Sequence, residues 1–386
     1  MPISAPVAAV VAGLHVPEEP VTSVVAVLGA ILGAVLFLPM LSKRIEENLE
    51  PFFLAMGIVG VVTLYATGLL SPEGLRELAL KALETPLFIH GVPIGITQVV
   101  LIAGYIFYRY HERITGGIRG LMERLGLPAF IFVIVLILGM TSSIISVIVA
   151  AVIFAEVMAS LPVPRAKKIE LTVIAAFALG MGAALTPVGE PLATIAVAKL
   201  RGPPYHAGPL FLLKHIGPYI VPGVIALSVL AALRARGARL EKPAAEAAAE
   251  EEYTETTRTV VMRAVRVFIF VAALELLGTS FTPLVEWYFV KIPPHVLYWV
   301  NMISAVVDNA TLTAAEIGPH MTLAQIKSAL ISLVISGGML IPGNIPNIVA
   351  AGRLRITSKE WARIGVPLGI ALLLIYYLVL MAQGIH

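Results

Sequence analysis

Two acidic residues lie in apolar stretches where a charged side chain is costly. Asp308 is the only aspartate among 24 acidic residues, and Asn309 follows it directly; Glu190 lies between Gly189 and Pro191. A carboxylate in apolar surroundings is stable only when a proton or a cation neutralises it, so the two compete for one site. This chemistry couples proton movement to cation binding. The structural alternatives are a carboxyl buried in its neutral form and a cap on a half-length helix.

Neutral oxygen-bearing side chains accompany both carboxylates. Oxygen ligands without sulfur suit hard cations, although small hydroxyl residues also mediate ordinary helix packing in membranes, and both roles stay open. The candidates are Asn301, Asn309, Thr311, Asn344 and Asn347 in the second half of the chain, and Ser142, Ser143, Ser146 and Thr186 in the first.

Three further glutamates fall within or beside the apolar runs. Glu156, Glu275 and Glu316 are each able to relay a proton or to pair with a neighbouring cation. Acidic residues inside membranes act both as proton relays and as partners in ion pairs. These three glutamates are therefore weaker candidates for the site than Asp308 and Glu190.

The composition places these residues in a membrane protein. The 386 residues are 58% hydrophobic and 13% charged, with a mean hydropathy of +0.92, and this length allows about ten spanning helices of about 20 residues each. A soluble enzyme is excluded, and the net charge of +3 reflects loop cations rather than nucleic-acid binding. The absence of cysteine excludes disulfides and thiolate metal sites. Few Asn and Gln residues are typical of thermophilic proteins. We therefore expect the source to be a thermophilic prokaryote.

Two stretches of the first half differ from simple spans. Residues 127–161 are too long for one crossing and too short for two, and the polar residues 139–146 in their middle predict a re-entrant hairpin. Residues 170–200 are interrupted by Thr-Pro-Val-Gly-Glu-Pro at 186–191, which predicts a discontinuous helix. Simple spans are predicted at 22–41, 52–70, 87–108, 213–233, 260–289 and 364–382.

The second half repeats this order. Residues 139–146 align with 301–308, and 187–191 align with 342–346. The sequence therefore predicts two repeats, each with a hairpin and a broken helix. The predicted organisation is a two-span scaffold segment (1–86), repeat 1 (87–234), a charged linker (235–258) and repeat 2 (259–386, with hairpin 293–320 and broken helix 323–353).

The distribution of lysine and arginine residues supports the two predicted hairpins and indicates how the chain is oriented in the membrane. With both hairpins re-entrant, twenty of the 27 lysines and arginines collect on one side, which the positive-inside rule makes cytoplasmic. Each repeat then crosses the membrane an odd number of times, so the second is inverted relative to the first. We predict an all-α polytopic protein of the cell membrane, built of two inverted repeats, with both termini outside.

Local motifs resemble the ion transporter superfamily, which includes NhaD-type sodium/proton antiporters, ArsB-type arsenite carriers, and dicarboxylate and citrate carriers. Ser304-Ala-Val-Val-Asp-Asn-Ala-Thr-Leu-Thr-Ala-Ala315 resembles the Asp-Asn hairpin of NhaD-like proteins, Leu185-Thr-Pro-Val-Gly-Glu190 their first break, and Arg363-Ile-Gly-Val-Pro367 the stretch after their second break. Pro342-Gly-Asn-Ile-Pro-Asn347 is similar to a prokaryotic group of predicted cation transporters. A second Asp-Asn pair of NhaD-like proteins is replaced here by Ser146-Val147. The resemblance implies a homodimer.

The residues and the resemblance together favour a secondary transporter that exchanges Na⁺ or another small cation for H⁺ by alternating access in the lipid bilayer. An anion carrier for a carboxylate or oxyanion is the alternative. An intramembrane enzyme is disfavoured because Ser143 has no histidine at a comparable predicted depth. No cofactor, and no metal other than the transported cation, is expected.

Overall fold

The protein is an all-α polytopic membrane protein. The computed structural model describes residues 13–46, 48–88, 95–238, 256–289, 294–307, 309–319 and 321–384. Within these ranges the chain forms helices and one isolated bridge between Leu14 and Leu70, and no strand. The described helices that are long and apolar enough to cross a membrane are α1, α3, α7, α12 and α19.

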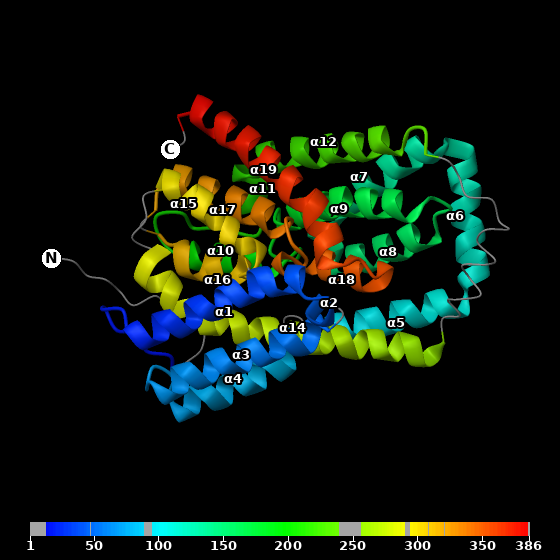
Figure 1. Cartoon of the computed structure of the whole chain (residues 1–386). Helices are drawn as coiled ribbons and strands as arrows, with labels where there is room; N and C mark the ends of the chain where they lie inside the picture. The colour runs from blue at the N-terminus through cyan, green and yellow to red at the C-terminus, as the bar shows by residue number, and fades with distance from the viewer. Residues whose placement is uncertain are drawn as a thin grey trace.

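Six helices precede the first predicted hairpin. They are α1 (Thr22–Leu41), α2 (Lys43–Glu46), α3 (Leu49–Ala66), α4 (Pro72–Glu84), α5 (Ile96–Arg109) and α6 (His111–Leu125). The predicted span at 87–108 starts too early, because α5 begins at Ile96, and residues 89–94 lie outside the described ranges. α6 lies across the ends of other helices at one end of the molecule (Figure 1).

Helix α4 has no counterpart among the predicted spans. Ser71 caps it by accepting a hydrogen bond from the backbone N–H of Gly74, and Pro72 occupies its first position, where a missing N–H costs nothing. Its charged residues hide it from a search for apolar runs, although its buried positions Gly74, Leu78 and Ala82 recur at helical spacing.

The middle of the chain supplies α7 (Leu127–Ile145), α8 (Val147–Ser160), α9 (Arg165–Ala183), α10 (Pro191–Lys199), α11 (Phe211–His215) and α12 (Gly217–Ala235). α7 and α8 are joined by one residue, Ser146, and pack against each other, so the chain reverses its direction there. The interruption between α9 and α10 covers residues 184–190, because Pro187, Gly189 and Pro191 do not continue a helix.

The last third supplies α14 (Thr257–Leu284), which continues as a π-helical turn (Val285–Phe289), then α15 (Pro294–Val300), a 3₁₀ turn (Asn301–Ala305), α16 (Asn309–Glu316), α17 (Leu323–Gly337), a second 3₁₀ turn (Ile341–Gly343), α18 (Ile345–Leu354) and α19 (Ser358–Ala382). The predicted linker at 235–258 lies mostly in residues 239–255, outside the described ranges.

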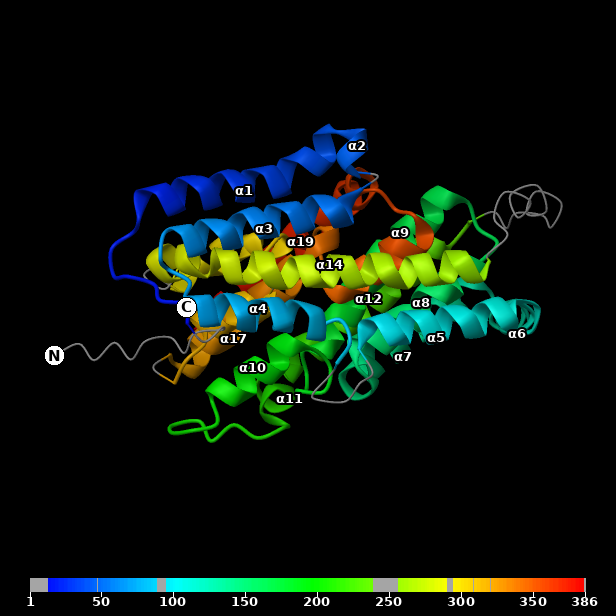
Figure 2. The same cartoon turned by 90° about the horizontal axis from the view of Figure 1, so that it is seen from below.

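The helices pack as two groups. In the α14 group, α14 runs between α3 on one side and α4 and α5 on the other (Figure 2), with α1 against α3. In the hairpin group, α7, α9 and α12 pack together, α18 packs on α8, and α10 packs on α16. The last two contacts pair the second half of each broken helix with the second arm of the other hairpin. The division into two inverted repeats stays a prediction.

Candidate functional site

The tip of the first hairpin contacts the break of the first discontinuous helix. Ser146 at the tip has φ +72°, a conformation that costs a non-glycine residue about 1–3 kcal/mol and that concentrates at functional sites. Its hydroxyl accepts a hydrogen bond from the N–H of Ile148 at 3.4 Å. The N–H of Val147 donates to the Gly189 carbonyl at 2.9 Å. The hairpin tip and the break therefore form one junction, here called junction 1.

Three predicted site residues hold junction 1 together through backbone carbonyls. The Ser142 hydroxyl lies 2.7 Å from the Gly139 carbonyl and 3.0 Å from that of Leu179. The Ser143 hydroxyl donates to the Met140 carbonyl at 2.9 Å, and Thr186 donates to the Ser143 carbonyl. Two of these contacts connect α7 to α9 and to its break, so packing is at least part of the role of these hydroxyls.

Glu190 is buried at the first position before α10. Its side chain is 4% exposed and makes no capping hydrogen bond to α10, so the alternative role of a helix cap is not what this carboxyl does. It lines a cavity of about 230 Å³ together with Ser146, Thr194 and Ile345. Ile345 is the first residue of α18, so this cavity joins junction 1 to the second broken helix.

The second hairpin contacts the second break in a corresponding way. The Ser304 hydroxyl donates to the Leu333 carbonyl of α17 at 3.3 Å. A Cβ on Gly343 would lie 2.9 Å from the carbonyl oxygens of Ser304 and Ala305, so only glycine allows the two backbones this approach. We call this contact junction 2.

Two predicted asparagines close the gap between α17 and α18. The amide nitrogen of Asn347 donates to the carbonyl of Gly337, at the end of α17, at 2.8 Å and to that of Leu340 at 2.7 Å, in a region where the i to i−4 backbone hydrogen bonds of α17 have ended. The side-chain oxygen of Asn344 accepts from the N–H of Ile345 at 2.8 Å. Asn347 therefore replaces the backbone hydrogen bonds that the break removes.

Buried polar atoms without hydrogen-bond partners gather around the end of α17. Within the described part of the chain these include Nδ2 of Asn309, Oγ of Ser336 and Oδ1 of Asn347. Nδ2 of Asn309 lies 3.6 Å from the position that a Cβ of Gly337 would take, and Asn347 bonds the Gly337 carbonyl. Such atoms are rare in native proteins, so this region is a candidate site for a small polar or ionic ligand.

Two predicted site residues cannot be placed in this geometry. Asp308 lies outside the described residues, as does the side chain of Thr311. Asn309, which follows Asp308, is 4% exposed and is the first residue of α16.

Asn301 and Glu316 belong to a separate polar cluster within the second hairpin. Nδ2 of Asn301 donates to a carboxylate oxygen of Glu316 at 3.1 Å and to Oγ of Ser332 at 2.9 Å. Both residues are buried. The cluster connects the two hairpin arms to α17, so a structural role accounts for Asn301.

The other two candidate relays are held in ion pairs. Glu156 on α8 is bonded by Arg263 of α14 at 3.3 Å and by Arg353 of α18 at 2.8 Å, with side chains 4% and 11% exposed. Glu275 on α14 pairs with Lys81 of α4 at 2.6 Å. Lys81 is therefore a residue of helix α4 and not a loop cation.

The arginines around Glu156 are functional candidates that the sequence analysis leaves among the loop cations. Arg263 bonds Glu156 and falls within the predicted span at 260–289, and its position inside an apolar run is the signal that could have singled it out. Among the described residues no three of His, Asp and Glu gather as they do around a tightly held metal ion.

Comparison with known proteins gives a family and no activity. No curated protein matches the sequence. The family model described as "Protein of unknown function (DUF1646)" matches residues 25–382, which is nearly the whole chain and includes both hairpins and both broken helices. The chain therefore belongs to the DUF1646 family.

Proposed function

We propose that the protein is a secondary active transporter that exchanges a small cation, with Na⁺ as the first candidate, for protons by alternating access. The position of Glu190 carries the proposal. This buried carboxyl lines a cavity at the point where a hairpin tip, a helix break and the start of α18 meet. Unwound backbone at membrane depth is typical of transporter sites, where it supplies carbonyl and N–H groups to the substrate.

The chemistry follows from the surroundings of Glu190. The described lining of its cavity includes Ser146, Thr194 and the apolar residues Ile148 and Val271. In such surroundings either a bound proton or a bound cation stabilises the carboxyl, and binding of one releases the other. Asp308 is the second carboxylate of the proposal, since the neighbouring Asn309 is buried with its Nδ2 close to Gly337 at the end of α17.

The cavities support a movement of one helix group against the other. The cavity of about 230 Å³ at Glu190 lies between Thr85 and Val271 of the α14 group and the tip, break and α18 of the hairpin group. A larger cavity of about 550 Å³ lies between α3 and α14 on one side and α18 on the other. Loosely filled boundaries are where rigid groups slide most easily, because close-packed interiors resist deformation.

The charge around Glu190 favours a cation over an anion. No lysine or arginine is found among the described residues that line this cavity. A carboxylate or oxyanion substrate would have to be desolvated next to a glutamate in a cavity whose described lining is otherwise neutral or apolar, which is unfavourable. The anion carrier is therefore the less supported alternative.

Proteoliposomes that contain a pH-sensitive dye test the proposal. We expect Na⁺ or Li⁺ added to wild-type vesicles to dissipate an imposed pH gradient, and Glu190→Gln and Asp308→Asn to abolish this response. Glu77→Gln is the matched control, because Glu77 is an exposed residue of α4. Uptake of a labelled dicarboxylate without any cation-dependent proton movement would overturn the cation assignment.

A further inference from the structure

The carboxyl of Glu316, the last residue of α16, is buried in the second hairpin. Its side chain is 5% exposed, and its Oε2 accepts a hydrogen bond from Nδ2 of Asn301 at 3.1 Å. Among the described residues Asn301 is the one that bonds this carboxyl, and Oε1 is buried without a partner. An ionised carboxylate in such surroundings is strongly unfavourable, because burial removes its water without replacing it. Glu316 therefore requires a proton or a bound cation.

The described charged residues on the elements that pack against α16 interact elsewhere. These elements are α10, α14, α17, and the π-helical and first 3₁₀ turns. Lys199 of α10 interacts with Glu286 of the π-helical turn, and Lys327 of α17 lies over an aromatic ring of α12. On α14, the charged residue closest to the π-helical turn is Glu275, which is in an ion pair with α4. None of these groups bonds Glu316.

The orientation of the Asn301 amide follows from its second partner, Ser332 of α17. The Ser332 hydroxyl donates its hydrogen to the Ala329 carbonyl at 2.8 Å. Its oxygen can therefore only accept from Asn301, whose Nδ2 lies 2.9 Å away. The amide nitrogen thus bonds both Ser332 and Glu316, while Oδ1 of Asn301 is buried without a partner. Two hydrogen-bond acceptors, Oε1 of Glu316 and Oδ1 of Asn301, are left over on this pair.

We propose that Glu316 is a proton-binding site, in which Oε1 carries the proton and donates it to Oδ1 of Asn301. One proton changes Oε1 from an acceptor into a donor, so it satisfies both remaining atoms at once. It also removes the buried charge. The acid and the amide then exchange two hydrogen bonds, and through Ser332 they fasten both arms of the hairpin to α17. The site does not depend on cation exchange at Glu190.

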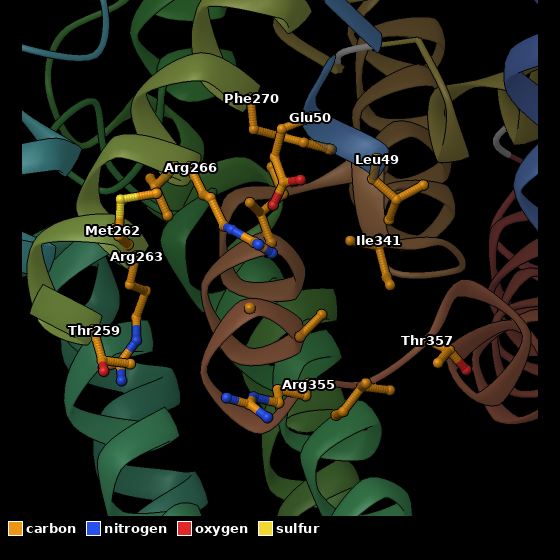
Figure 3. Close-up of a pocket in the computed structure, with 15 residues that line it drawn as sticks. Leu49, Glu50, Thr259, Met262, Arg263, Arg266, Phe270, Ile341, Arg355 and Thr357 are labelled. Carbon is orange, nitrogen blue, oxygen red and sulfur yellow. The ribbon is translucent and has the colours of Figure 1, made fainter. Parts of the chain in front are cut away.

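A proton fits this pair better than a metal cation does. Small hard cations take about six oxygen ligands, whereas the pair leaves two acceptors without a partner. The two cavities described above also lie elsewhere. The smaller one is at Glu190, and the larger one is lined by residues of α3, α14 and α18 and of the turns beside them (Figure 3). Neither Asn301 nor Glu316 is among the described residues that line them.

Infrared spectroscopy of the full chain in an uncharged detergent detects a protonated carboxyl through its C=O stretch. At neutral pH we expect the difference spectrum between wild type and Glu316→Gln to contain this band, and the band to move to lower frequency when the glutamates carry a heavier carbon isotope. Asn301→Leu should shift the band to higher frequency, because the acid loses its hydrogen-bond partner. Glu77→Gln, at an exposed position of α4, is the control and should leave this region of the spectrum unchanged.

Thermal unfolding midpoints test the pair in a second way. Glutamine has the shape of a neutral glutamic acid and its amide N–H replaces the acid O–H, so Glu316→Gln should keep the wild-type midpoint. Glu316→Met leaves the Asn301 amide without its partner and should lower the midpoint. The proposal is overturned if the difference spectrum lacks the band, or if Glu316→Gln is as unstable as Glu316→Met. It is also overturned if sodium chloride, compared with choline chloride, raises the midpoint of wild type but not of Glu316→Gln, since a cation would then occupy the site.

Discussion

The Nε atom of Arg353 donates to the carboxylate of Glu156 at 2.8 Å, and this hydrogen bond connects α18 to α8. Arg263 of α14 bonds the same oxygen at 3.3 Å. One buried carboxylate therefore holds the second arm of the first hairpin, the second half of the second broken helix and a helix of the α14 group. Among the described ion pairs, the pair of Glu156 with Arg263 connects the hairpin group to the α14 group, across the boundary along which the cavities lie.

Neutralising Glu156 should destabilise the protein strongly. Glu156→Gln leaves two guanidinium groups, each 11% exposed, without their anion, and breaking a buried pair in this way costs about 3–5 kcal/mol. The measurement is the free energy of unfolding in detergent. Glu170→Gln is the control, because its partners Lys167 and Arg234 are 27% and 60% exposed, and it should cost less than about 1 kcal/mol per pair. Equal losses for the two variants would contradict the central position of Glu156.

Alanine at Gly182 should separate α7 from α9. A Cβ at this position would lie 1.8 Å from the Gly139 carbonyl oxygen, so the helices must move apart at a cost of about 1–3 kcal/mol or more. Gly116→Ala on α6 has no atom within 4 Å of its Cβ and should be neutral or stabilising. Thermal unfolding midpoints of both variants check this, and an unchanged midpoint for Gly182→Ala would show that the helices are not in close contact.

Removing the amide of Asn347 should affect both stability and transport. Asn347→Ala removes the amide donor from the carbonyls of Gly337 and Leu340, of which Leu340 keeps a hydrogen bond from the N–H of Gly343, at a cost of about 1–3 kcal/mol. Asn48→Ala removes only an exposed hydrogen bond to the Arg44 carbonyl and should change stability by less than about 0.5 kcal/mol. Cation-dependent proton movement in vesicles, compared at equal amounts of folded protein, should fall in Asn347→Ala alone. Full exchange in that variant would exclude junction 2 from the ion pathway.

Glu275 should prove to be a structural residue rather than a proton relay. Its ion pair with Lys81 at 2.6 Å is half-open to solvent, with side chains 39% and 16% exposed, so Glu275→Gln should cost no more than about 1 kcal/mol. The exchange rate should keep its dependence on pH. A shift of that pH profile in Glu275→Gln, with Lys81→Met as the comparison, would return Glu275 to the pathway.

The sequence locates helix interruptions well because they have local causes. Pro187 and Gly189 lie between α9 and α10, Pro191 is the first residue of α10, and Pro342 and Gly343 lie between α17 and α18; closely spaced proline and glycine residues disfavour a continuous helix. The single-residue turn at Ser146 lies at the end of the polar stretch that predicts the first hairpin tip. Such features need no knowledge of tertiary contacts.

Partners of the polar residues could not be predicted in this way. Glu156 and Arg353 are almost two hundred residues apart, and composition cannot show which of many arginines meets a given glutamate. The same limit applies to Ser142 and Thr186, whose oxygen chemistry suits a cation and also suits the backbone carbonyls that they bond. Helix α4 was hidden for another reason, because its burial depends on α14 rather than on overall hydrophobicity.

The incompletely filled boundary between the two helix groups makes the protein responsive to hydrostatic pressure. Compression favours whichever conformer holds less empty volume, so a change in cavity volume during the proposed exchange cycle should be measurable as a reaction volume. Exchange rates recorded in a high-pressure cell would then give the sign of that volume change and identify the conformer in which the crevices close.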